Sequence, residues 1–225
     1  SFLAAKAANI LAEKLHFIDG SNEAKFMICR ASVEKDDLLT ARFILSKVYG
    51  EERIRILLCI SEHFLFPLEQ RAHFENAFPL LTEAVNSSKS IGSSKWYYES
   101  LLTLSKYYFI KGDLAKGRDA IRQVISSCEK ASDFANEAHY WSELGTYMPK
   151  ADSTLQEIIH SHDMAFNCYL KVGNTAEAAY SLRDKAYAEI DMNQLDIAEK
   201  DGLQAISMMK SIKRRPSFRT YAMMD

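Results

Sequence analysis

A repeated pattern with a period of about 40 residues constrains the fold of this chain more than any other feature of its sequence. When the sequence is shifted by one such period, Cys128 aligns with Cys168, and the segment Glu137-Ala-His-Tyr140 aligns with Glu177-Ala-Ala-Tyr180. The similarity extends from about residue 70 to the C-terminus. Self-similarity at a fixed spacing is typical of repeat proteins, in which each unit buries its apolar face against the next unit. We therefore expect a linear array of stacked units.

Turn-forming residues divide each repeat into two helices. Short connections such as Lys111-Gly-Asp113 and Gly173-Asn174 separate segments whose apolar residues recur with helical spacing. From Gly50 onward the pattern predicts helices at about 51–65, 69–90, 94–110, 114–130, 134–148, 153–171, 175–191 and 195–211. Before Gly50 it predicts helices at about 2–18, 22–33 and 36–49, with a break at Gly20-Ser-Asn22. A single amphipathic helix cannot bury its apolar stripe alone, so these helices are expected to stack in series.

The composition agrees with an all-helical fold. The chain has only 8 Gly and 4 Pro in 225 residues, too few for the many tight turns of an all-β protein. Its formal net charge of −2 argues against a general binder of nucleic acids. No apolar run approaches the ~20 residues that span a bilayer. We therefore expect neither a nucleic-acid partner nor a membrane span.

The four cysteines occur singly, without the Cys-x-x-Cys pair that would indicate a metal or redox site. Their surroundings predict that all four are small hydrophobic residues of the core: Cys29, Cys59, Cys128 and Cys168. Single cysteines within helices fit a reducing compartment better than an oxidising one, which favours the cytoplasm. A periplasmic sensor segment is the alternative.

Motif residues within the repeats resemble a known family. The segment Trp141-Ser-Glu-Leu-Gly-Thr-Tyr-Met148 is similar to the Trp-x-x-Leu-Gly-x-x-Tyr signature of tetratricopeptide repeats (TPR), with Met148 in place of the usual Tyr. Leu101 to Tyr108, followed by Gly112-Asp113, matches the same helix and turn, and residues 182–198 give a weaker third match. The long period resembles the variants found in kinesin light chains, peptide-responsive bacterial regulators and bacterial sensor proteins. The resemblance implies an all-α, right-handed superhelical solenoid of antiparallel helix pairs.

The whole chain, residues 1–225, is expected to form a single TPR-like domain. Residues 1–50 would form divergent N-terminal helices, residues 51–211 about four helix pairs, and residues 212–225 the start of a further repeat. Within this array Gly145 is expected to let the partner helix approach closely. A repeat that starts without its partner helix predicts a fragment of a longer protein, with a homodimer through the C-terminal end as a further expectation.

The resemblance implies a non-catalytic scaffold or input module that binds a peptide or protein segment within a larger signalling or regulatory protein. In this family the first helix of each pair lines a concave surface, and polar residues at corresponding positions face the ligand. Carried over to this sequence, these positions are Glu99, Thr103, Lys106, His139, Ser142, Glu143, Thr146, Tyr180, Arg183, Asp184 and Tyr187. Their mixed charges indicate a ligand with both signs. The Lys and Asn set that clamps an acidic C-terminus in chaperone-binding relatives is absent.

Two other classes of function stay open. One is the sensory domain of a bacterial histidine kinase or transcription regulator, which would act through dimerisation or ligand binding. The other is a small-molecule or catalytic domain on an unrelated helical fold, which would require a deep pocket with perturbed carboxylates.

Sequence signatures of enzymes and cofactor sites are largely missing. The chain has no Walker loop, no Gly-x-Gly-x-x-Gly, no His-Glu-x-x-His and no Gly-x-Ser-x-Gly. Glu157-x-x-His160 has the spacing of a di-iron helix, but no second such motif accompanies it, so we interpret it as a solvated or capping pair. The basic segment from Lys210 to Arg219 is interpreted as a helix C-terminus with favourable cations. The alternatives are contact with a nucleic acid or a membrane surface, or presentation of Ser217 as a kinase target. We expect no catalytic residues, no metal and no cofactor.

Overall fold

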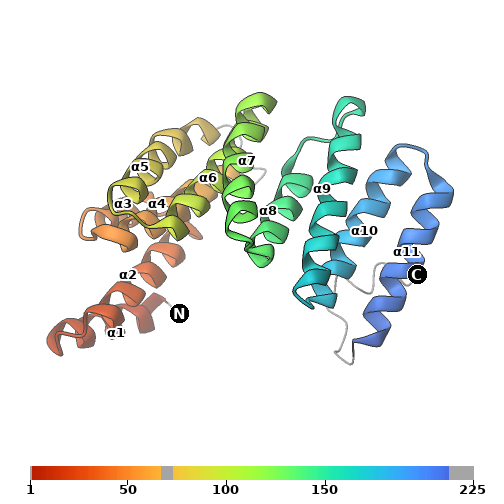
Figure 1. Ribbon diagram of the computed structural model, residues 1–225. Helices are drawn as coiled ribbons and strands as arrows, with labels where there is room; N and C mark the ends of the chain where they lie inside the picture. The colour runs from red at the N-terminus through yellow and green to blue at the C-terminus, as the bar shows by residue number, and fades with distance from the viewer. Residues whose placement is uncertain (1, 67–72, 213–225) are drawn as a thin grey trace. The chain divides into compact units, whose positions relative to one another are not determined.

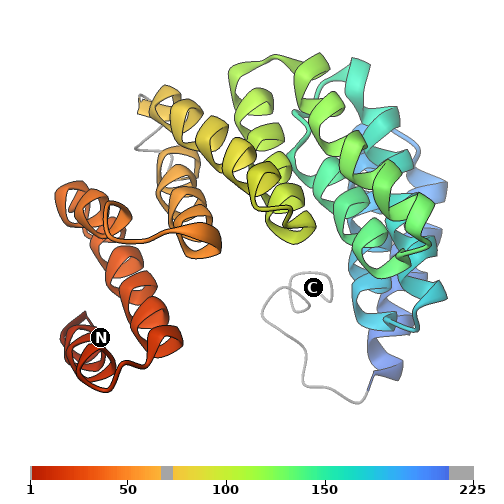
Figure 2. The same ribbon diagram turned by 60° about the vertical axis from the view of Figure 1, so that its left-hand side comes forward.

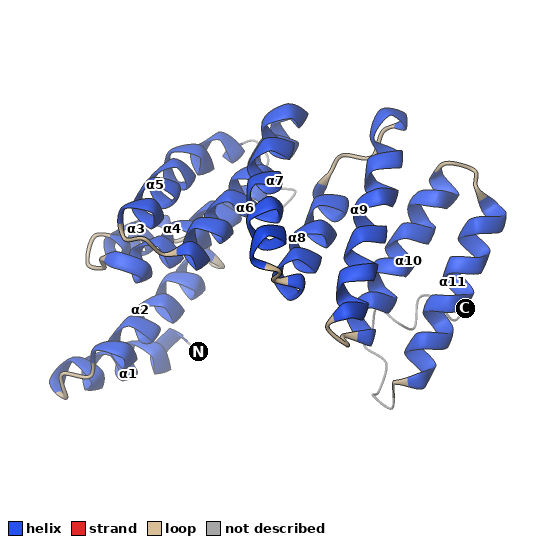
Figure 3. Cartoon of the chain, in the orientation of Figure 1, coloured by secondary structure: helices blue, strands red, loops and turns tan. Residues whose placement is uncertain are grey.

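The structure is a computed structural model that describes residues 2–66 and 73–212. Within these residues the regular secondary structure is helical throughout, with no strand, and most helices that are adjacent in the chain pack against one another (Figure 1, Figure 3). The prediction of an all-α fold built from consecutively packed helices is confirmed. The arrangement is compatible with a helical repeat.

The chain divides into two compact units, Ser1–Ile110 and Lys111–Asp225. We call them the N-terminal unit and the C-terminal unit. Their boundary lies between Ile110 and Lys111, just before the turn at Gly112. That the chain forms a single TPR-like domain stays a prediction. Of the further repeat expected at 212–225, only Ile212 lies within the described residues, and most of the basic segment 210–219 lies outside them.

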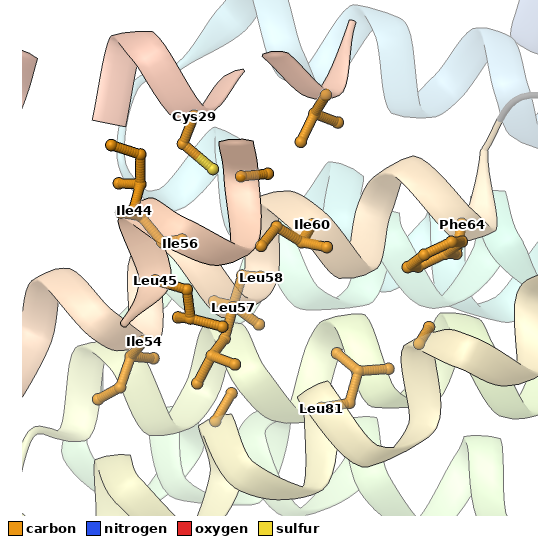
Figure 4. Packing of buried hydrophobic residues seen from close by; sticks show 14 of the residues in the cluster. Cys29, Ile44, Leu45, Ile54, Ile56, Leu57, Leu58, Ile60, Phe64 and Leu81 are labelled. Carbon is orange, nitrogen blue, oxygen red and sulfur yellow. The ribbon is translucent and has the colours of Figure 1, made fainter. Parts of the chain in front are cut away.

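The N-terminal unit is built around one central helix. Its described helices are α1 (Phe2–Lys14), α2 (Ile18–Val33), α3 (Leu38–Leu45), α4 (Gly50–Leu65), α5 (Ala77–Ser90) and α6 (Ser94–Lys111). Helix α4 carries apolar side chains on more than one face, so it has to be covered from several sides. It packs against α2, α3 and α5. Figure 4 shows Cys29, Ile44 and Leu81 from these three helices gathered around the buried side chains of α4.

The C-terminal unit follows the predicted helices closely. It consists of α7 (Leu114–Ala131), α8 (Phe134–Tyr147), α9 (Asp152–Lys171), α10 (Thr175–Asp191) and α11 (Leu195–Ser211), which follow one another in chain order (Figure 1, Figure 2). Asp113, Asp133 and Asn174 each accept a hydrogen bond from a backbone N–H in the first turn of the next helix. Such N-caps satisfy donors that a helix leaves unpaired and so fix where α7, α8 and α10 begin.

The predicted break at Gly20-Ser-Asn22 is wrong. Helix α2 begins at Ile18 and continues through Gly20, while the chain reverses at His16, whose φ is +52°. A Cβ atom at Gly20 would lie 2.3 Å from Cδ1 of Phe17. Gly20 therefore leaves room for the Phe17 ring, which lies against helix α2 at this position. The turn at His16 does not depend on Gly20.

Two other predicted helices differ in length from the observed ones. The segment expected at 36–49 is helical only over Leu38–Leu45, because Asp37 caps its start through the N–H of Thr40. Of the helix expected at 69–90, the described part is α5, preceded by a single 3₁₀ turn over residues 73–76. Residues 67–72 lie outside the described range.

Candidate functional site

The eleven residues predicted to line a ligand-binding surface belong to both units. Glu99, Thr103 and Lys106 lie on α6 of the N-terminal unit. The other eight lie on α8 and α10 of the C-terminal unit, and we call them the α8–α10 set: His139, Ser142, Glu143, Thr146, Tyr180, Arg183, Asp184 and Tyr187. That all eleven form one continuous surface stays a prediction.

Two of the three α6 residues have little exposed surface, and the third, Glu99, is half-buried. Thr103 is 3% exposed, and its hydroxyl donates a hydrogen bond of 3.0 Å to the backbone oxygen of Glu99. Lys106 is 8% exposed, and its ammonium group lies 5.7 Å from the ring centroid of Phe66. A buried hydroxyl paired with its own helix offers little to a ligand, and a Lys held over an aromatic ring gains a cation–π interaction in place.

Helix α8 contributes polar side chains that are at least partly accessible. His139, Ser142 and Glu143 are half-buried, and Thr146 is exposed. The His139 ring lies 5.1 Å from the ring of Tyr140, centroid to centroid. Their spacing along α8 puts these polar groups on neighbouring turns of one helix, as the repeat positions predicted.

Helix α10 contributes a charged pair flanked by aromatic rings. The Arg183 guanidinium contacts the Asp184 carboxylate twice, with N–O distances of 2.8 Å and 2.6 Å. Its central carbon also lies 5.1 Å from the ring centroid of Tyr180, within the range of a cation–π interaction. Tyr187 is 44% exposed. This helix therefore presents both charges and aromatic surface within three turns.

Helix α9 packs against both α8 and α10 and supplies a buried histidine between them. A Cβ atom at Gly145 of α8 would lie 2.7 Å from Nε2 of His162, so the predicted close approach at Gly145 is confirmed. His162 is 3% exposed, and its Nδ1 has no hydrogen-bond partner. Burial lowers the pKa of His162, while the nearby Asp184 raises it and Arg183 lowers it. The imidazole is thus held neutral and serves packing.

The two side chains of the Glu157-x-x-His160 motif contact different partners. The Glu157 carboxylate binds Arg118 at 2.7 Å and Arg122 at 2.8 Å, both on α7. His160 is exposed and packs edge-on against Trp141, at 5.6 Å between ring centroids. In residues 2–66 and 73–212 no three His, Cys, Asp or Glu side chains gather as a metal site would require.

Sequence reasoning missed a charged cluster that joins three helices of the C-terminal unit. The Lys185 ammonium on α10 lies 2.9 Å from both Asp163 of α9 and Asp201 of α11, and 3.7 Å from Glu189. Burial alone would lower the pKa of Lys185, but the hydrogen bonds to Asp201 and Asp163 outweigh it and raise that pKa to about 12. Burial raises the pKa of Glu189, which is 2% exposed. The one signal in the sequence was the helical spacing of Lys185 and Glu189.

Comparison with models of known protein families finds none that matches this sequence, and comparison with curated proteins likewise finds no match. Of the helices in the described ranges, none combines the length and apolar character needed to span a bilayer.

Proposed function

We propose that this chain is a TPR-like, right-handed solenoid of antiparallel helix pairs that binds a peptide or protein segment and has no catalytic activity. Three features support this assignment: the motif at Trp141 to Met148, the similar lengths of α7 to α11 and their consecutive packing. Helical repeats of this kind generate extended surfaces, which suit a ligand that is itself extended.

The observation that carries the proposal is the composition of the α10 surface. Tyr187 is 44% exposed, and Arg183 lies next to both Asp184 and Tyr180. The Arg183 side chain is 11% exposed. Tyr and Arg are the residue types that most often dominate binding energy at protein interfaces. An Arg–Asp pair offers both donors and acceptors, so a peptide with both charges could hydrogen-bond to either partner.

The polar residues of α8 extend the same chemistry. Ser142 and Glu143 are half-buried and Thr146 is exposed, so they offer hydroxyl and carboxylate groups near the protein surface. Together the α8–α10 set would recognise an extended segment that carries an aromatic or aliphatic anchor beside a charged group. We propose the cytoplasm as its compartment, because Cys128 and Cys168 are buried free thiols.

The proposal is tested by selecting peptides from a displayed random library on the full chain and measuring their affinity by calorimetry. We expect Tyr187→Ala and Arg183→Ala each to weaken binding by about 1 kcal/mol or more, as interface anchors do. Arg122→Ala is the matched control, since Arg122 is also an ion-paired arginine but lies on α7. Equal effects of Arg183→Ala and Arg122→Ala would contradict the assignment to α10.

A sensory module that acts through dimerisation is the second candidate, and α11 favours it. Leu195, Ile197 and Leu203 on this helix are 57%, 50% and 60% exposed. Exposed apolar side chains on one helix are a common basis for association between copies of a chain. Light scattering of the full chain tests this candidate: it predicts a dimer that Leu203→Glu dissociates, and a monomer at all concentrations would exclude it.

A further inference from the structure

Two cysteines, Cys29 and Cys59, lie on helices α2 and α4, which pack against each other in the N-terminal unit. Cys29 on α2 is fully buried, whereas Cys59 on α4 is half-buried and free. Each thiol shifts the pKa of the other, as neighbouring groups do. They are far apart in the sequence, so only the packing of α2 on α4 brings them together.

Contacts on both sides of the thiols hold them together. Toward the start of both helices, Arg55 of α4 binds Glu23 of α2 at 2.6 Å. The same guanidinium lies 3.5 Å from the ring centroid of Phe26. Toward the end of both helices, His63 of α4 lies 3.1 Å from Asp36, which follows α2. The contacts occur in the same order along both segments. Cys29 and Cys59 therefore lie at the same level of the two helices, with contacts between the segments on either side of them.

The two thiols differ in a way that assigns them different chemical roles. The neighbouring Cys29 thiol lowers the pKa of Cys59, and the nearby Arg30 lowers it further, against opposing effects of burial and of Glu62 and Glu34. The neighbouring Cys59 thiol, and then burial, raise the pKa of Cys29. Because Cys59 is half-buried whereas Cys29 is fully buried, Cys59 is the group that an external oxidant would meet first.

We propose that Cys29 and Cys59 form a redox-active pair that a peroxide converts into a disulfide linking α2 to α4. The Cys59 thiolate attacks one peroxide oxygen, the O–O bond breaks, and Cys59 becomes a sulfenic acid while the second oxygen leaves, protonated, as water or an alcohol. The Cys29 sulfur then attacks the Cys59 sulfur. The hydroxyl group leaves as water with the Cys29 proton, and the S–S bond forms. Hydrogen peroxide is thereby reduced to two molecules of water per disulfide.

The C-terminal unit provides internal controls. Cys128 and Cys168 are both buried, and the thiol of Cys168 donates a hydrogen bond of 3.3 Å to a Glu137 carboxylate oxygen. Burial and that contact raise the pKa of Cys168 to about 11, and burial likewise raises the pKa of Cys128 to about 11. No second thiol takes part in these interactions, so Cys128 and Cys168 are expected to resist oxidation by peroxide.

The test is mass spectrometry of the reduced full chain before and after treatment with hydrogen peroxide. We expect the treated chain to lose the mass of two hydrogen atoms, to yield a peptide that links Cys29 to Cys59, and to revert with dithiothreitol. Cys128→Ala and Cys168→Ala should leave this product unchanged, while Cys59→Ser should abolish it. A treated chain that keeps four free thiols, or one that oxidises Cys59 to the sulfinic acid without a linked peptide, would overturn the proposal.

A Cys29 variant separates the two chemical steps. Because Cys29 is fully buried, Cys29→Ala is preferred to a serine that would bury an unpaired hydroxyl. Circular dichroism would establish that the variant keeps its helices. In folded Cys29→Ala we expect Cys59 to stop at the sulfenic acid, which dimedone traps, and failure of dimedone to label it would contradict the assigned role of Cys59.

Discussion

The Nε2 atom of His162 on α9 lies 2.7 Å from the position that a Cβ atom would take at Gly145 on α8. Real Cβ atoms essentially never approach another heavy atom so closely, so the imidazole occupies space that only a glycine leaves open. This contact sets how closely α8 and α9 can pack against each other.

Replacing Gly145 should destabilise the protein. We expect Gly145→Ala to cost ~1–3 kcal/mol of unfolding free energy, because the new methyl group forces the buried ring of His162 to move, and Gly145→Leu should cost more. Gly202 on α11 is the matched control, since a Cβ atom there would meet nothing within 4 Å. Gly202→Ala should instead stabilise its helix by ~0.5–1 kcal/mol. Urea unfolding of both variants measures the difference, and equal effects would contradict the close approach.

The buried His162 should make stability fall in acid. Burial lowers its pKa in the folded state below the usual value of 6.5, against the charge of Asp184. Below that value the unfolded chain binds a proton that the folded chain does not, so stability decreases as the pH drops through this range. One such group contributes at most about 1.4 kcal/mol per pH unit. Urea unfolding between pH 7.5 and 5.5 should show a shallower decrease for His162→Gln than for the wild type, and identical slopes would show that His162 is not responsible.

The charged cluster around Lys185 should matter far more than a surface ion pair of the same length. Lys185→Met leaves Glu189 and Asp201 buried without their cation, so we expect a loss of ~3–5 kcal/mol at neutral pH. Lys150 also lies 2.9 Å from an aspartate, but its side chain is 61% exposed. Lys150→Met should therefore cost less than about 1 kcal/mol. Thermal and urea unfolding compare the two variants, and losses of similar size would mean that burial does not control the strength of the cluster.

Local signals explain why the helices of the C-terminal unit could be predicted closely. Asp113, Asp133 and Asn174 cap helices through their own side chains, and Gly112 and Gly173 adopt positive φ between helices. These determinants lie within a few residues of the boundary that they define, so they can be recognised in the sequence. Gly20 shows the limit of this reasoning, because its role depends on the ring of Phe17 and not on the backbone of a turn.

Contacts between packed helices could not be predicted. The repeat correctly assigned Arg183 and Tyr187 to one helix. Position on a helix alone does not determine what covers a side chain, however: Thr103 is buried, whereas Tyr187 is 44% exposed. The partners of Lys185 come from α9 and α11, and the pairing of Cys29 with Cys59 lies where the period is weakest. Such groupings arise from the register between packed helices, which no single segment of sequence encodes.

The most direct test of the proposed function is site-specific photo-crosslinking of a selected peptide to the full chain. Tyr187 on α10 and Leu203 on α11, which are 44% and 60% exposed, would each be replaced by p-benzoyl-phenylalanine in separate proteins. We predict that the protein labelled at position 187 crosslinks to the peptide and that the protein labelled at position 203 does not. Crosslinking at 203 with none at 187 would contradict the claim that the α8–α10 set binds the ligand.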